Sequence, residues 1–158
     1  LSHKVDNQWI YYCCGHHYKV SNRYLSMPSY RNRIMGLQLY KYKLKGFLQW
    51  GYNFYYSELS NYEINPYLTT GAEGRFPSGD AFTVYPGKNG PYLSIRALIF
   101  YEGLQDISAL RLLEKKVGRK KALEIVVDAA NMDITFEDYP RNSEFLPSLR
   151  DKIIDILL

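Results

Sequence analysis

The chain has 158 residues, of which 46% are hydrophobic, and a formal net charge of +4. This length and apolar content predict one domain that buries a sizeable core. Basic residues alternate with acidic ones, which disfavours nucleic-acid binding, and no apolar run is long enough to span a membrane. The sequence begins at Leu1 without an initiator methionine or a leader pattern, so we interpret it as a piece of a longer chain whose compartment stays undetermined.

The first half of the chain predicts a strand, a helix and a second strand. Trp9–Cys14 is a continuous apolar run, typical of a parallel strand covered on both faces. Ser26 is the expected N-cap of a helix that reaches about Leu44. Gly46 then begins the second strand, and the three elements form a right-handed parallel βαβ unit.

A long polar segment, Ser57–Ser78, precedes the expected third strand, Asp80–Tyr85. A connection of this length inside a compact domain is usually functional or mobile. Ser94 is the expected N-cap of the next helix, and Gly118 is its expected stop. Two more amphipathic helices are predicted over Arg119–Asn131 and Phe145–Leu158.

This order of elements predicts an α/β fold, as either a doubly wound sheet or part of a (β/α)8 barrel. In both folds ligands bind at the carboxyl ends of the parallel strands. In this sequence those ends are Cys13–His17, Trp50–Tyr56 and Tyr85–Asn89.

The strand end that follows Gly46 is dense in aromatic residues and carries one carboxamide. Flat apolar faces with polar edges are what a sugar site needs, and Gly51 leaves room for a close approach to the backbone. The candidate substrate-binding residues are Trp50, Asn53, Tyr52 and Tyr55. The alternative interpretation is an aromatic core strand that leads into a loop, with Asn53 as a turn residue.

Other polar residues favour structural roles. Asp80 opens the expected third strand and would lie on the stabilising face of a barrel, away from the ligand. Glu102 and Asp106 lie on one helix and require a cation between them, such as Arg96 or another basic residue. We predict a structural charge cluster there.

The segment Cys13, Cys14, His16 and His17 contains metal-ligand types, but structural zinc sites use spaced pairs of ligands. We therefore predict no metal and no cofactor, and favour a thiol and an imidazole that line a pocket. A cysteine nucleophile is disfavoured, because nothing orients a histidine base beside it. The adjacent cysteines cannot easily form a disulfide with each other.

Four motifs occur in order along the chain, and together they carry a resemblance. They are Trp9–Gly15, Gly46–Asn53, Gly79–Gly87, and Ser94–Arg96 with Glu102–Asp106. From about Trp9 to about Leu113 the chain resembles the C-terminal signatures of glycoside hydrolase family 123 and the related DUF4091 domain.

The resemblance implies a partial (β/α)8 TIM-type barrel. Residues 1–118 would supply its last three parallel strands, and residues 119–158 a helical extension packed on the barrel. It implies retaining hydrolysis of β-linked N-acetylgalactosamine, in which the substrate's own acetamido oxygen attacks the anomeric carbon. An adjacent Asp-Glu pair would orient that group and protonate the leaving oxygen, an exception to the scheme with two separate carboxylates.

The chain departs from the family in one respect: no Asp is followed by Glu anywhere in it. The nearest pair, Glu137-Asp138, is reversed and lies between two helices. We therefore expect the catalytic pair to lie outside these residues and this chain to supply part of the sugar pocket. The alternatives are a non-catalytic carbohydrate-binding or interaction module, and a structural remnant whose aromatic residues are only core.

Strands cut from a barrel leave open sheet edges and an exposed inner face. We therefore expect this chain to self-associate or to rearrange its strands so that these surfaces are covered.

Overall fold

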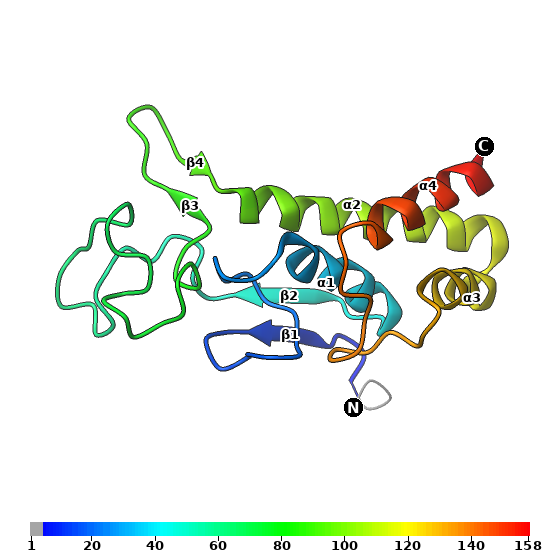
Figure 1. Ribbon diagram of the computed structural model, residues 1–158, viewed down its shortest axis with the longest axis horizontal. Coiled ribbons are helices and arrows are strands. Elements are labelled where there is room, and N and C mark those ends of the chain that lie inside the picture. Colours follow the sequence, from blue (N-terminus) through cyan, green and yellow to red (C-terminus); the bar gives the residue numbers. More distant parts are fainter. Residues whose placement is uncertain (1–4) are drawn as a thin grey trace.

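The structure, a computed structural model, describes residues 5–158 and has a mixed α/β architecture with four helices and two small sheets (Figure 1). Its strands are β1 (Trp9–Tyr12), β2 (Gly46–Gln49), β3 (Val84–Tyr85) and β4 (Tyr92–Leu93). Its helices are α1 (Ser29–Lys41), α2 (Ile95–Val117), α3 (Arg119–Ala130) and α4 (Phe145–Leu157). None of the helices within residues 5–158 is both long and apolar enough to cross a membrane.

The strands β1 and β2 pair in parallel with α1 as their connection, so the predicted βαβ unit is confirmed. The register runs from Trp9 opposite Gly46 to Tyr12 opposite Gln49. On one face of this sheet, Tyr12 and Phe47 pack against α1 and α2 in an apolar cluster. That arrangement follows from the alternation of side chains along a strand.

The other face of the β1–β2 sheet is open, so the prediction of a strand covered on both faces is wrong. Trp9 is 61%, Tyr11 45% and Leu48 48% exposed on this face. Continuous apolarity indicates that both faces suit burial, but no helix within the described residues lies over the second one. We call these three side chains the open face.

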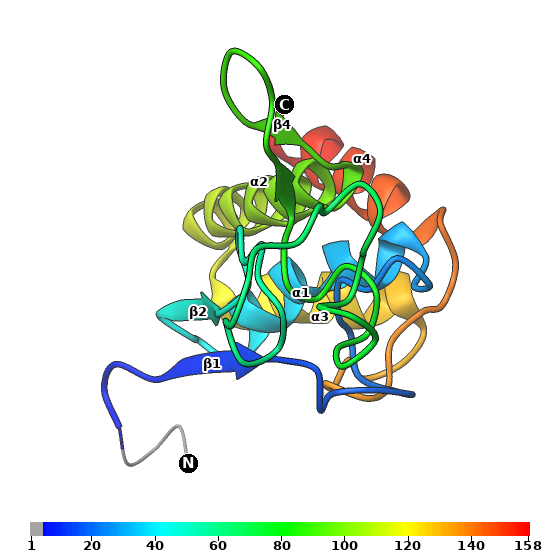
Figure 2. The same ribbon diagram turned by 90° about the vertical axis from the view of Figure 1, so that its left-hand side faces the viewer.

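The predicted third parallel strand is also wrong. Within Asp80–Tyr85 only the last two residues form β3, and β3 pairs with β4 in antiparallel fashion, with Val84 opposite Leu93. A connection of six residues joins β3 to β4, which is too short for the crossover that parallel pairing needs. The preceding residues also run antiparallel to the chain after β2, through a bridge between Asn53 and Phe82. The hairpin projects beyond the strand ends (Figures 1 and 2).

The ends of α2 are confirmed. Its N-cap is Ser94, whose Oγ accepts a hydrogen bond of 3.2 Å from the Ala97 N–H, and Gly118 ends it at φ +81°. The expected start of α1 is wrong, because the residue before its first turn is Pro28 and no side chain caps it. Its end comes earlier than Leu44, because Lys43 adopts φ +54°.

Helices α1 and α2 cross at a pair of glycines. A Cβ built on Gly36 would lie 2.1 Å from the carbonyl oxygen of Gly103, so only glycine allows this approach. Around the crossing, α1 to α4 share one buried core, and the predicted helices α3 and α4 are confirmed. The most buried residues of this core include Ile34, Leu37, Leu110, Leu113, Ala122, Val126, Ile134 and Ile153.

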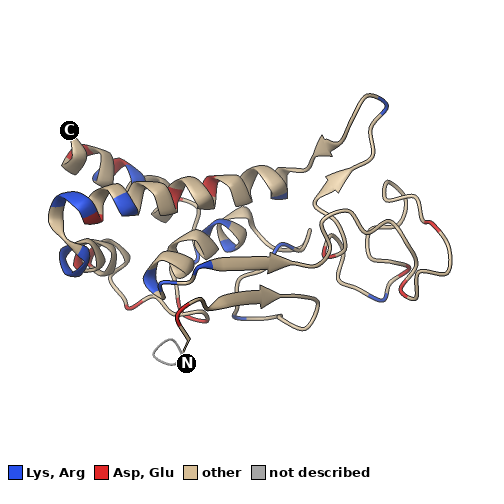
Figure 3. Ribbon diagram, turned by 180° about the vertical axis from the view of Figure 1, so that it is seen from behind, with Lys and Arg blue, Asp and Glu red and all other residues tan. Residues whose placement is uncertain are grey.

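A charge cluster ties α1, α2 and α4 together, as the sequence predicted for Glu102 and Asp106. Arg33 donates from Nε to Asp106 Oδ2 at 2.7 Å, and Arg150 donates from Nε to Asp106 Oδ1 at 2.9 Å. Arg150 Nη1 also donates to Glu102 Oε2 at 2.7 Å. Arg33 and Arg150 both lie within ion-pair distance of the two carboxylates, whereas Arg96 turns away and donates to the Gly79 carbonyl. Figure 3 shows how basic and acidic residues alternate along the helices.

Candidate functional site

The chain that follows β2 makes a long excursion and returns to the carboxyl ends of β1 and β2. Where it returns, a Cβ on Gly51 would lie 2.6 Å from the Asp80 carbonyl oxygen, so the expected close approach to the Gly51 backbone is confirmed. The Phe54 N–H donates to the Ala81 carbonyl at 3.0 Å and closes the excursion. The return segment therefore covers the strand ends.

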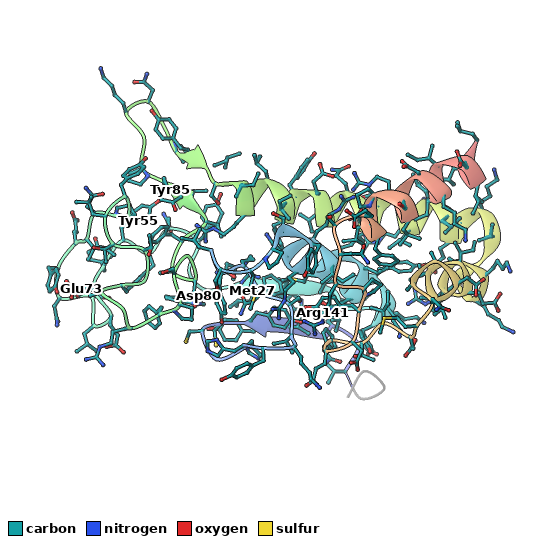
Figure 4. All side chains as sticks on the ribbon, in the orientation of Figure 1. Met27, Tyr55, Glu73, Asp80, Tyr85 and Arg141 are labelled. Atoms are coloured by element: carbon teal, nitrogen blue, oxygen red, sulfur yellow. The ribbon has the colours of Figure 1, made fainter. Side chains whose placement is uncertain are left out.

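Asp80 lies at these strand ends (Figure 4) and accepts a hydrogen bond of 3.0 Å at Oδ2 from Trp50 Nε1. The expectation that Asp80 belongs to the opposite, stabilising face is wrong, because it rested on the third parallel strand that does not form. Asp80 is only 1% exposed, and its Oδ1 has no hydrogen-bond partner within residues 5–158. The Asp80 carboxyl group is thus buried, with only one of its two oxygens hydrogen-bonded in the described part of the chain.

Burial raises the pKa of Asp80 above its ordinary value, because a buried site disfavours the charged form. The Trp50 hydrogen bond and the nearby charge of Arg23 oppose that rise in pKa, as do His17 and His16. The carboxyl group therefore keeps its proton to a higher pH than an exposed aspartate does.

Trp50 is held by more than this hydrogen bond. Its ring packs between Phe54, at 5.5 Å between centroids, and Phe76, at 4.9 Å and edge to face. The indole is only partly buried, so its orientation is fixed while part of it stays accessible.

Arg23 is a second buried charged residue near the strand ends, and the sequence analysis missed it. Its guanidinium carbon lies 4.8 Å from the centroid of the Phe47 ring, and the residue is 3% exposed. None of its three guanidinium nitrogens has a hydrogen-bond partner within residues 5–158. Burial lowers the pKa of Arg23 to about 10, and the charge of Asp80 opposes that effect, so the group is cationic at neutral pH.

The Cys13–His17 segment forms a turn at the end of β1. The Cys13 N–H donates to His16 Nδ1 at 3.2 Å, and the Tyr24 hydroxyl donates to the Cys13 carbonyl at 2.9 Å. The Cys13 Sγ lies 4.0 Å from His16 Nδ1. Burial raises the pKa of Cys14, which favours its unreactive thiol form. Across the described part of the chain, no group of three or more His, Cys, Asp and Glu residues is arranged to hold a metal ion.

The other candidate substrate-binding residues do not gather around Trp50. Tyr52 is 53% exposed and lines a cavity of about 490 Å³ between β2 and α2, together with Arg23. Asn53 is exposed and pairs through its backbone with Phe82. The Tyr55 hydroxyl donates to the Val84 carbonyl at 2.7 Å within the loops beyond the strands (Figure 4). The structure therefore separates the aromatic stretch into three environments.

Comparison with known families gives a match over most of the chain. The family model described as the glycoside hydrolase 123 catalytic domain matches residues 2–113. This span includes β1 to β4, Trp50, Asp80 and Arg23, and it ends within α2. No curated protein matches the chain.

Proposed function

The chain belongs to the glycoside hydrolase 123 family, and from this premise we propose that it supplies one wall of a site for 2-acetamido sugars. The family match over residues 2–113 is the observation that carries the proposal. The sugar in the proposal is β-linked N-acetylgalactosamine, and the site belongs to a (β/α)8 barrel of which β1 and β2 are two strands.

The Trp50–Asp80 pair supports this assignment. An indole that is fixed by Asp80 and two phenylalanine rings offers a flat apolar surface, which suits the apolar face of a sugar ring or an acetamido methyl. The pair lies at the carboxyl ends of parallel strands, where α/β folds bind their ligands. Asp80 acts here as a positioning residue for Trp50.

In this proposal the acid chemistry comes from elsewhere in the complete enzyme, because this chain contains no Asp followed by Glu. We expect no release of nitrophenol from p-nitrophenyl β-N-acetylgalactosaminide by the 158-residue chain. Release of nitrophenol by the purified chain would contradict this division of roles.

The sugar site is tested by tryptophan fluorescence. The chain has two tryptophans, Trp9 and Trp50, so the variant Trp9→Phe leaves Trp50 as the only indole reporter. Titration with N-acetylgalactosamine should change its emission and saturate at millimolar sugar, whereas galactose, which lacks the acetamido group, should change it less. An emission that stays constant at high millimolar N-acetylgalactosamine would remove Trp50 from the site.

A non-catalytic carbohydrate-binding or interaction module is the second candidate, and the missing Asp-Glu pair favours it. The gene that encodes the chain distinguishes the two candidates. Additional β/α units with an Asp-Glu pair at a strand end, encoded upstream of Leu1, would support the enzyme. Saturable sugar binding without such units would support the module.

A further inference from the structure

A row of aromatic rings leads from Trp50 into the excursion that follows β2. The Trp50 ring lies 5.5 Å from the Phe54 ring, and the Phe54 ring lies 5.9 Å from the Tyr56 ring, measured between centroids. The second contact places the rings of Phe54 and Tyr56 on the same side of the chain. We call Trp50, Phe54 and Tyr56 the aromatic row.

A short hairpin within the excursion holds the outer end of the aromatic row. Tyr56 forms an antiparallel bridge with Glu63, and the Ser57 N–H donates to the Tyr62 carbonyl at 3.0 Å. These backbone contacts fix the position of Tyr56 independently of its side chain. The ring of Tyr56 is therefore held in place without having to be buried.

Tyr56 keeps an exposed ring, in contrast to its neighbour Tyr55. The Tyr55 ring packs on Phe82 at 5.7 Å between centroids, and its hydroxyl donates to the Val84 carbonyl (Figure 4), so Tyr55 stabilises the loops. Tyr56 is 40% exposed, and within residues 5–158 its one ring contact is Phe54. An exposed ring in line with the sugar wall is a surface on which a further sugar unit can stack.

The charged groups around Tyr56 are mostly acidic. The Tyr56 hydroxyl donates to Glu63 Oε1 at 3.4 Å, and Glu63 is exposed, so its carboxylate can also accept hydrogen bonds from sugar hydroxyls. Residues 57–78 contain three glutamates and a single basic residue, Arg75, which pairs with Glu58 at 3.1 Å. Such a surface repels a sugar that carries a carboxylate or a sulfate.

We propose that the aromatic row binds a neutral oligosaccharide, with N-acetylgalactosamine on Trp50 and a second sugar unit on Tyr56. The hydroxyls of the second unit donate to Glu63. The ring contacts set the direction of the glycan, the exposed ring of Tyr56 provides the stacking surface, and the acidic surroundings select an uncharged sugar. This inference rests on the proposed sugar site at Trp50 and extends that site by one sugar unit.

Three ligands test the inference by the Trp50 emission of the Trp9→Phe variant at low ionic strength, where exposed charges are screened least. They are N-acetylgalactosamine, the disaccharide in which it is β-linked to galactose, and the disaccharide in which it is β-linked to glucuronic acid. The galactose disaccharide should bind about tenfold more tightly than the monosaccharide, and more tightly than the glucuronic acid disaccharide. Equal affinities for the monosaccharide and the galactose disaccharide would overturn the inference and leave the site at Trp50 intact. Tighter binding of the glucuronic acid disaccharide would also overturn it, whereas no response to any ligand would remove the Trp50 site and this inference together.

A matched pair of tyrosine variants locates the second sugar unit. Tyr56→Ala should reduce the affinity for the galactose disaccharide to that for N-acetylgalactosamine, and should leave binding of the monosaccharide unchanged. The control is Tyr62→Ala, because Tyr62 is 52% exposed in the same hairpin but donates its hydroxyl to Glu73, and it should bind the disaccharide normally. Equal affinities of the two variants for the disaccharide would refute the position on Tyr56.

The variant Glu63→Gln tests the charge selection. It removes the negative charge and keeps an acceptor for sugar hydroxyls, so it should narrow the difference in affinity between the galactose and glucuronic acid disaccharides. An unchanged difference would contradict the contact with Glu63. If Tyr56→Ala does not fold by circular dichroism, this comparison decides the inference.

Discussion

Two buried aspartates distinguish the two ends of the molecule. Asp106, at 6% exposure among the helices, is bonded on both oxygens by Arg33 and Arg150. Asp80, at 1% exposure at the strand ends, has one donor, Trp50, and an oxygen without a partner in the described part of the chain. The helical end thus satisfies its own charges, whereas the strand end retains buried polar groups that are incompletely bonded. Incomplete bonding is the property expected where a protein binds something else.

The largest effect should come from disrupting the helical end at its crossing. Gly36→Ala would place a Cβ 2.1 Å from the Gly103 carbonyl oxygen, and a helix backbone cannot move aside cheaply. We expect a loss of about 3 kcal/mol or more in the free energy of unfolding, measured by urea denaturation. Gly15→Ala is the control, because its Cβ would meet only the Cys13 Sγ at 3.9 Å. Similar losses in both variants would contradict the close crossing.

The second effect concerns the satisfied aspartate. Asp106→Asn keeps the shape of the side chain but removes the more buried of the two carboxylates that face Arg33 and Arg150, which leaves both guanidinium groups with Glu102 alone. We expect a loss of about 3 kcal/mol in the free energy of unfolding at neutral pH. An unchanged free energy of unfolding would show that the cluster contributes nothing to stability.

The third variant, Asp80→Asn, makes the same substitution at the strand end. Its effect on the free energy of unfolding should have the opposite sign. Because burial raises the pKa of Asp80, the folded chain holds this proton at pH values where the unfolded chain has lost it. Ionisation of Asp80 therefore lowers stability as the pH rises through the raised pKa. Asp80→Asn removes the ionisation and keeps an acceptor for Trp50.

We therefore expect Asp80→Asn to be more stable than the parent chain at about pH 7. The difference should shrink as the pH falls below the ordinary pKa of aspartate, where both states of the parent are protonated. Thermal unfolding across this pH range measures the effect. If Asp80→Asn is instead less stable than the parent chain at neutral pH, the attraction between Arg23 and the Asp80 carboxylate outweighs the cost of burying that carboxylate.

The smallest effect on stability concerns the open face. Leu48→Lys changes a side chain that is 48% exposed, so we expect the free energy of unfolding to shift by no more than about 0.5 kcal/mol. The same variant should reduce self-association in sedimentation velocity, if the open face is what associates. A parent chain that sediments as a monomer at every concentration would rule out the expected self-association.

Local signals in the sequence predicted the helices well, except for the start of α1. Ser94 and Gly118 mark the ends of α2 because a capping hydroxyl and a positive φ act within one turn of the chain. The βαβ unit and the close approach at Gly51 were also predictable. Partner choice was not: the apolar pattern of Asp80–Tyr85 indicates a strand, but it does not say which strand pairs with it or in which direction.

The site was harder to predict than the fold for the same reason. Asp80 was assigned to the wrong face because its position depends on where a long excursion returns. Arg23 carries no signal at all, since a single arginine in a polar loop is normally solvated, whereas here its guanidinium packs over the Phe47 ring in the folded chain. Trp50 is a predicted substrate-binding residue because of its aromatic neighbours in the sequence, whereas its bond to Asp80 depends on the tertiary structure.

The closure of the excursion after β2 has a consequence for limited proteolysis. Arg75 lies in the middle of it with a side chain that is 70% exposed, which makes it a tryptic site. Cleavage there would leave Trp50 and Phe54 on one piece and their partners Asp80 and Ala81 on the other. The nicked protein should therefore elute as one species in native buffer and as two in denaturant. The excursion between these paired ends could be lengthened at its exposed part at little entropic cost.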